Sequence, residues 1–192
     1  MKIGIYSGSF NPVHIGHISL VEYIVNQGIV DCVWMIRSPQ NPLKQSNALL
    51  SDEHRLKMLE LAIEDYDNLE VCSIEDNLPK PNYTINTLNA LKRKYPEEEF
   101  SLIIGADNWQ IFDKWKDWDI ILKDFSLIVY PRPGYEIDFS KMAKYPTVTF
   151  VDAPLFDVSS TDIRNLIKEH RDFSEYVPIK VGNYIKEYNL YL

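Results

Sequence analysis

The chain has 192 residues, of which 45% are hydrophobic and 25% charged, a balance typical of an ordinary globular protein rather than of a disordered or membrane chain. Its formal net charge of -8 argues against nucleic-acid binding, which needs clustered Lys and Arg to neutralise phosphates. No stretch is long and apolar enough to cross a bilayer, and the N-terminus lacks the features of a signal peptide. We therefore expect a cytoplasmic protein with neither a membrane nor a nucleic acid as partner.

Short apolar runs alternate with segments of helical periodicity along the chain. Lys2–Tyr6 predicts a buried strand, and Ile15–Asn26 carries apolar residues at helical spacing before Gly28 ends it. The same patterns predict further strands at Ile29–Ile36, Leu69–Ile74, Phe100–Gly105, Leu127–Tyr130 and Val148–Val151, and helices at Ser51–Asp65, Tyr83–Tyr95, Asp162–Glu169 and Pro178–Glu187. Strands that are apolar on both faces and alternate with amphipathic helices are typical of a parallel sheet covered on two sides.

We therefore predict one α/β domain over residues 1–192, a doubly wound, Rossmann-like parallel sheet with helices on both faces and a helical C-terminal end. Ligands of such a sheet bind at the carboxyl ends of its strands. The two cysteines, Cys32 and Cys72, lie in apolar stretches without a CxxC spacing, which favours buried free thiols over a disulfide or a zinc site.

The stretch GSFNPVHIGH follows the first predicted strand. Gly8 ends the strand, and the helix that follows presents unpaired N–H groups and a positive dipole end, which together bind phosphate. His14 and His17 can face the same ligand from its first turn, and Gly16 removes a side chain where a phosphate would come close. The stretch matches neither GxxxxGK[ST] nor GxGxxG, so it does not support those nucleotide-binding classes. A single histidine here would be a surface or capping residue, but the pair favours a phosphate site.

A second polar stretch, VSSTDIR, begins a helix near the C-terminus. Ser160 and Thr161 present hydroxyl and N–H groups at the helix start, and Arg164 lies one turn further on, within reach of the same anion. Taken alone, the stretch is equally consistent with a plain N-capped helix.

Together the two stretches resemble the (T/H)xGH and ISSTxIR motifs of the nucleotidyltransferase superfamily, whose members join a nucleotide to a phosphorylated acceptor and release pyrophosphate. The fuller form GxFNPxHxGH resembles the bacterial nicotinate-nucleotide adenylyltransferases in particular. Three further stretches resemble that family's SYTxDTL, IGxDxxxxxxxW and RPG segments, namely NYTINTL at 82–88, IIGADNWQIFDKW at 103–115 and YPRPGY at 130–135. The resemblance covers essentially the whole chain.

The resemblance implies the roles of particular residues in joining ATP to nicotinate mononucleotide. It implies ATP binding by Gly8, Ser9, Phe10, His14, His17, Gly105, Asp107, Ser160, Thr161 and Arg164, of which His14, His17 and Arg164, with Lys44, would be catalytic. It implies acceptor binding by Asn11, Lys44, Thr84, Trp115 and Arg132. Trp115 would stack on the pyridine ring, since an electron-poor ring gains burial and quadrupole energy on a large aromatic face. Mg²⁺ would be held mainly by the ATP phosphates, without a protein metal site.

The sequence departs from the family pattern at Leu43, where His is frequent, and at Asn86, where Asp is frequent. These departures weaken the assignment of the acceptor more than that of the reaction. Two alternatives stay open: an adenylyltransferase for nicotinamide mononucleotide or phosphopantetheine, and a nucleotide-binding sensor without turnover. On its own, Trp115 would more often be a core residue, and Asp107 could equally cap a helix. The sequence also allows a homo-oligomer.

Overall fold

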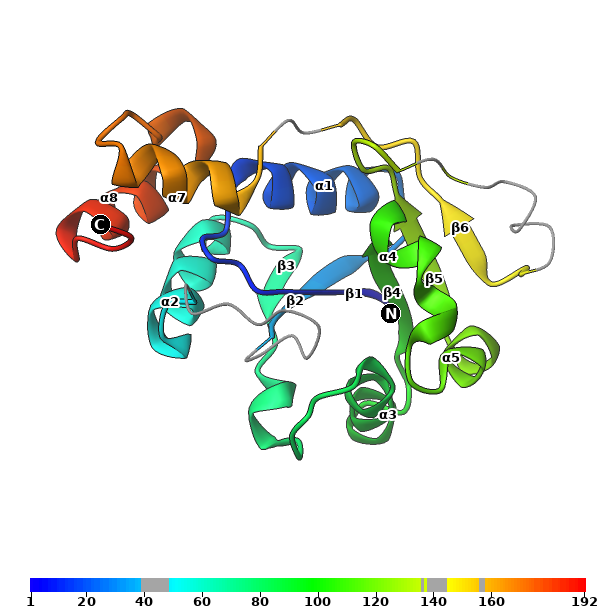
Figure 1. The fold of residues 1–192 in the computed structure, drawn as a ribbon. Helices are drawn as coiled ribbons and strands as arrows, with labels where there is room; N and C mark the ends of the chain where they lie inside the picture. The colour runs from blue at the N-terminus through cyan, green and yellow to red at the C-terminus, as the bar shows by residue number, and fades with distance from the viewer. Residues whose placement is uncertain (39–48, 136, 138–144, 156–157) are drawn as a thin grey trace.

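A computed structural model describes residues 1–38, 49–135, 137, 145–155 and 158–192. In these residues, six parallel strands form one sheet in the order β3-β2-β1-β4-β5-β6 (Figure 1). The strands are β1 (Lys2–Gly8), β2 (Cys32–Arg37), β3 (Leu69–Val71), β4 (Glu99–Gly105), β5 (Ser126–Tyr130) and β6 (Val148–Phe150). The order confirms the predicted doubly wound α/β sheet.

Helices cover both faces of the sheet (Figure 1). One face packs against α1 (Ile15–Asn26), α2 (Asp52–Ile63), α7 (Ser160–Lys168) and α8 (Ile179–Glu187). The other packs against α3 (Thr84–Lys94), α4 (Ala106–Gln110) and α5 (Trp118–Asp124). Single turns of 3₁₀ helix lie at η1 (Ile74–Asn77), η2 (Phe112–Lys114) and η3 (Ser174–Tyr176). Two apolar cores, one on each face, therefore hold the sheet between them, and α7 and α8 form the predicted helical C-terminal end.

The main differences between the observed and the predicted elements concern β2, β3 and the segment between β4 and β5. β2 begins at Cys32 rather than Ile29. Asp31, just before it, binds the first residue of β1: its N–H donates to the Lys2 carbonyl, and its carboxylate accepts from the Lys2 N–H. β3 ends at Val71, and the chain turns into η1 where a continued edge strand was expected. The short helices α4 and α5 between β4 and β5 were not predicted.

The topology has a switch point between β1 and β4. From β1 the chain crosses to β2 on one side, whereas β4 pairs with the opposite side of β1, so the strand order reverses between these two strands. Parallel doubly wound sheets bind ligands at such a switch point. Gly8 and Gly105, the last residues of β1 and β4, lie at this switch point.

Within the described ranges, every helix is too short or too polar to span a membrane. Cys32 is buried and Cys72 is half-buried, and both are free thiols. Both thiols are free, as predicted. Cys32 is also buried as predicted, whereas Cys72 is only partly buried.

Candidate active site

The loop between β1 and α1 is tightly packed around Phe10. Phe10 is 1% exposed and has a φ of 43°, in the left-handed region that a bulky residue rarely adopts. A Cβ at Gly8 would lie 3.0 Å from the Phe10 ring, so glycine is what lets the ring close over the strand end. The ring meets His17 edge-on, with centroids 5.1 Å apart. Phe10 of this loop thus packs against His17, one of the two predicted histidines.

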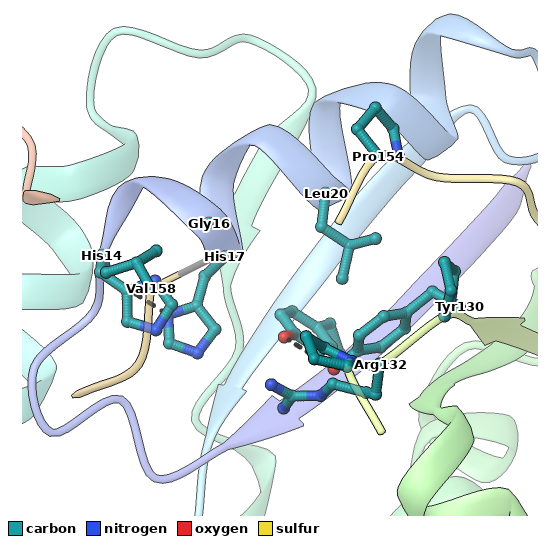
Figure 2. Close-up of a pocket in the computed structure, with 11 residues that line it drawn as sticks. His14, Gly16, His17, Leu20, Tyr130, Arg132, Pro154 and Val158 are labelled. Carbon is teal, nitrogen blue, oxygen red and sulfur yellow. Dashed lines mark hydrogen bonds between the residues drawn. The ribbon is translucent and has the colours of Figure 1, made fainter. Parts of the chain in front are cut away.

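The two histidines occupy the first turn of α1. His14 is the N-cap residue and His17 follows three positions later, and their rings stack with centroids 3.6 Å apart (Figure 2). The backbone N–H of His14 donates to Nδ1 of His17 at 3.2 Å. Because an accepting ring nitrogen carries no proton, the neutral His17 ring bears its N–H on Nε2. His17 is therefore held in the tautomer that can donate from Nε2 to an anion.

Both histidines are neutral at pH 7. Burial lowers the pKa of His14 to about 4, with the positive charge of Arg132 acting in the same direction. Burial also lowers the pKa of His17 well below its usual value, as do His14 and Arg132. The site without a ligand thus presents fixed N–H dipoles and the positive end of α1 to an incoming phosphate.

The second motif docks directly on the first. Ser160 and Thr161 are the first two residues of α7, whose N-cap is Ser159. The Ser160 hydroxyl donates to the Pro12 carbonyl at 2.8 Å, and Nη1 of Arg164 donates to the Asn11 carbonyl at 2.8 Å. The structure thus joins residues about 150 positions apart and brings the N-terminal ends of α1 and α7 to one site.

Asp107 and Arg132 face each other beside this site. A Cβ at Gly105 would lie 2.3 Å from Oδ1 of Asp107, so a side chain there would displace the carboxylate. Nε of Arg132 lies 3.6 Å from the same oxygen, and its guanidinium lies over the Tyr130 ring. Arg132, predicted for the acceptor, lines the pocket that also contains His14 and His17, approaching it from the end of β5 (Figure 2). A phosphate in the pocket would have cationic and N–H donors on two sides.

The two aromatic segments predicted for the acceptor lie beside each other. Thr84 is the first residue of α3, and Trp115 follows η2; both are half-buried. Nζ of Lys116 sits 4.6 Å above the Tyr83 ring, which joins the two segments. Trp115 also packs on the core, with its ring 5.3 Å from that of Phe112. Its position is compatible with one ring face on the core and further ring surface open to a ligand.

Some predicted residues lie elsewhere or have other partners. Lys44 and Leu43 lie outside the described residues. Asn11 is 4% exposed, and its Oδ1 accepts from the Leu50 N–H at 3.3 Å and from the Tyr191 hydroxyl at 3.0 Å. Its side-chain oxygen is thus engaged inside the protein.

Sequence reasoning missed the fully buried Arg55, which donates to the carbonyl of Ser9 at 2.6 Å. A charged residue in the first turn of a predicted helix gave no sign that it faces the interior. Ser9 keeps its predicted place in the loop after β1, but its carbonyl is bound to Arg55 rather than open to a ligand.

A parallel doubly wound sheet, with a histidine pair and an arginine at two helix starts over its switch point, defines a nucleotide-binding protein of the nucleotidyl-transfer class. The Cytidylyltransferase-like family model matches residues 5–166. The chain is 42% identical over 191 residues to the probable nicotinate-nucleotide adenylyltransferase of Flavobacterium johnsoniae, covering 100% of this chain and 99% of that protein. The corresponding protein of Bacteroides fragilis is 46% identical over 176 residues, with coverage of 92% and 87%. The chain belongs to the nicotinate-nucleotide adenylyltransferase family, within the cytidylyltransferase-like proteins.

Solved structures share the same fold. The nicotinic acid mononucleotide adenylyltransferase of Plasmodium falciparum, in complex with NaAD, superposes with a TM-score of 0.83 at 22% identity, covering 99% of this chain and 97% of that one. A putative nicotinate-nucleotide adenylyltransferase from Vibrio parahaemolyticus gives a TM-score of 0.73 at 24% identity, with coverage of 99% and 94%. These likenesses establish the α/β architecture over the full chain.

Proposed function

We propose that this protein transfers the adenylyl group of ATP to nicotinate mononucleotide, giving nicotinate adenine dinucleotide and pyrophosphate, a step of NAD biosynthesis. One observation carries the proposal: the stacked pair His14 and His17 begins the helix that follows β1 at the switch point of the sheet, and the guanidinium of Arg164 binds the Asn11 carbonyl of the same segment. The family to which the chain belongs supports the same reaction.

The chemistry requires no protein nucleophile. An oxygen of the acceptor's phosphate attacks the α-phosphorus of ATP, the bond from that phosphorus to the bridging oxygen breaks, and pyrophosphate leaves with the electron pair. The attacking phosphate is ionised at pH 7, so no general base is needed and catalysis consists of positioning and charge stabilisation. Mg²⁺ enters as part of the MgATP substrate, bridging phosphate oxygens. Among the residues that the structure describes, no group of three His, Cys, Asp or Glu is arranged to hold a metal ion.

His17 is the donor to the α-phosphate in the transition state. Its Nδ1 is fixed by the His14 N–H, which directs the Nε2 proton outward. We assign His14 to the ATP phosphates, and Arg164 and Lys44 to the β- and γ-phosphates; Lys44 rests on the family resemblance alone. Preorganised donors of this kind act where charge develops on the reacting phosphate oxygens.

Further residues hold the two substrates around these groups. We assign ATP binding also to Gly8, Ser9, Phe10, Gly105, Asp107, Ser160 and Thr161, with Asp107 accepting from ribose hydroxyls. We assign the binding of nicotinate mononucleotide to Asn11, Thr84, Trp115 and Arg132. Arg132 lines the same pocket as the histidines, which supports a contact with the acceptor's phosphate.

Pyrophosphate release tests the proposal. The protein is mixed with MgATP and, in parallel, with nicotinate mononucleotide, nicotinamide mononucleotide or phosphopantetheine. A strong preference for the acid is expected. Equal or better release with nicotinamide mononucleotide would support the reaction but contradict the assignment of the acceptor. Release only with phosphopantetheine would assign a different class of acceptor. No release with any of the three would favour a nucleotide-binding sensor.

A further inference from the structure

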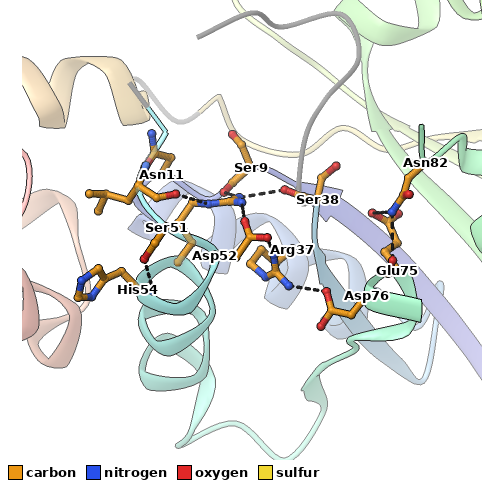
Figure 3. Close-up of polar contacts among 12 residues, drawn as sticks. Ser9, Asn11, Arg37, Ser38, Ser51, Asp52, His54, Glu75, Asp76 and Asn82 are labelled. Atoms are coloured by element: carbon orange, nitrogen blue, oxygen red, sulfur yellow. Dashed lines mark hydrogen bonds and ion pairs between the residues drawn. The ribbon is translucent and has the colours of Figure 1, made fainter. Parts of the chain in front are cut away.

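A buried arginine outside the histidine motif binds the loop that carries this motif. Arg55, on α2, is 0% exposed. It donates to the carbonyls of Ser9 at 2.6 Å, of Ser38 at 2.9 Å and of Leu50 at 3.2 Å, and it pairs with Asp52. Figure 3 labels three of these partners, Ser9, Ser38 and Asp52. One guanidinium thus fastens the loop after β1 to the end of β2 and to the start of α2, using donors in the several directions that arginine offers.

A second buried contact comes from the end of the chain. Tyr191 is 9% exposed, and its hydroxyl donates to Oδ1 of Asn11 at 3.0 Å. The Leu50 N–H donates to the same oxygen. Arg164 holds the Asn11 carbonyl. Asn11 is therefore fixed through both its main chain and its side chain, and Tyr191 reaches it across 180 positions of sequence.

The segment between these two contacts is conformationally demanding. Phe10 lies between Ser9 and Asn11 and has a φ of 43°. A non-glycine residue in that region costs on the order of 1–3 kcal/mol and persists only where its surroundings determine it. The contacts of Arg55 and Tyr191 supply such surroundings, and the loop leads directly into His14 at the N-cap of α1.

We propose that Tyr191 and Arg55 are positioning residues of the adenylyl transfer, holding Ser9–Asn11 so that His14 and His17 stay aimed at the reacting phosphates. The proposal rests on the proposed function for its kinetic consequence. Neither side chain needs to touch a substrate: both are buried, and their described polar contacts are with the protein. Small displacements of catalytic groups slow a reaction strongly, so the loss of one positioning hydroxyl can lower kcat.

The test removes only that hydroxyl. In Tyr191→Phe, kcat is expected to fall about tenfold, with a smaller change in the KM for ATP, because a misaimed donor weakens the transition state more than the ground state. Tyr188→Phe is the matched control, since Tyr188 lies in the same C-terminal segment, is exposed, and should retain full turnover. An unchanged kcat in Tyr191→Phe, or a loss that only follows the fraction of unfolded protein at the assay temperature, would overturn the proposal.

A second readout does not depend on activity. Backbone hydrogen exchange across residues 9–14 should be faster in Tyr191→Phe than in the unchanged protein or in Tyr188→Phe, because the loop is held less firmly. Unchanged exchange together with unchanged turnover would exclude positioning. The unchanged protein could also release no pyrophosphate with any acceptor while exchange is still faster in Tyr191→Phe. That result would reject the proposed function but keep the conclusion that Tyr191 holds the loop.

Arg55→Lys extends the test to the other contact. Lysine keeps the charge but cannot serve three carbonyls in fixed directions, so a larger loss of kcat than in Tyr191→Phe is expected if the protein folds. If thermal unfolding shows that Arg55→Lys does not fold, the tyrosine variant alone decides.

Discussion

The phosphate side and the acceptor side of the site are built differently. On the phosphate side, polar contacts from α2, α7 and the C-terminal segment converge on residues 9–17, and His14 is almost fully buried. On the acceptor side, Thr84 and Trp115 are half-buried, Lys116 lies over the Tyr83 ring of the other segment, and Trp115 packs on Phe112. Under the proposed function, the groups that stabilise charge are therefore held in place before the reaction, whereas recognition of the acceptor would rely on ring surfaces from separate segments.

This difference follows from what each side must do. Donors that stabilise developing charge contribute most when they are fixed before the reaction, because no energy is then spent on reorienting them. A ring stacked on tryptophan gains mainly buried area and a further 0.5–1.5 kcal/mol or so from its geometry, and tolerates small displacements. Substitutions on the phosphate side should thus reduce turnover, and those on the acceptor side should reduce affinity.

The largest effect is expected on the phosphate side for His17→Ala. Loss of one preorganised donor should lower kcat by about 10²–10³-fold, while ATP binding falls much less. Steady-state pyrophosphate release and calorimetric titration with ATP measure the two quantities. His54→Ala is the control, because His54 contacts Tyr184 on the α2–α8 surface and should keep full turnover. Equal losses of ATP affinity and kcat/KM would mean that His17 binds ATP uniformly instead.

A pH-dependent loss of stability should come next, from His14. Its pKa is about 4 in the folded protein against an unfolded value of about 6.5, so the unfolded chain binds more protons between these values. The free energy of unfolding should therefore fall as the pH drops from about 6.5 towards 4. From pH 7 to pH 4.5 this one group should remove about 2–3 kcal/mol.

Chemical denaturation of the unchanged protein and of His14→Gln checks this value. His17 titrates in the same direction in both proteins, and His14 itself lowers the pKa of His17, so the difference between the two pH slopes reports His14 together with its effect on His17. Identical slopes would show that His14 is not held neutral by burial.

The two regions also differ in how far the sequence predicts them. The strand–helix alternation and the glycine–histidine stretch are local patterns, so the sheet, α1 and the start of α7 follow from them. The five-residue α4 and seven-residue α5 are too short to display helical periodicity. The contacts of Arg55 with Ser9 and of Tyr191 with Asn11 join distant segments through tertiary packing, which no local pattern encodes. For the same reason the sequence could not place Arg132 beside the histidines.

The smallest effect is expected on the acceptor side, for Trp115→Ala. Losing the stacking face should raise the KM for nicotinate mononucleotide about tenfold, equivalent to about 1.4 kcal/mol, with kcat and the KM for ATP nearly unchanged. Trp118→Ala is a matched control, because Trp118 is also half-buried against the same apolar core and begins α5. If both variants raise the acceptor KM equally, the effect comes from the core and Trp115 is no ligand platform. If Trp115→Ala lowers kcat as strongly as His17→Ala, the acceptor side is as preorganised as the phosphate side, and the division between turnover and affinity does not hold.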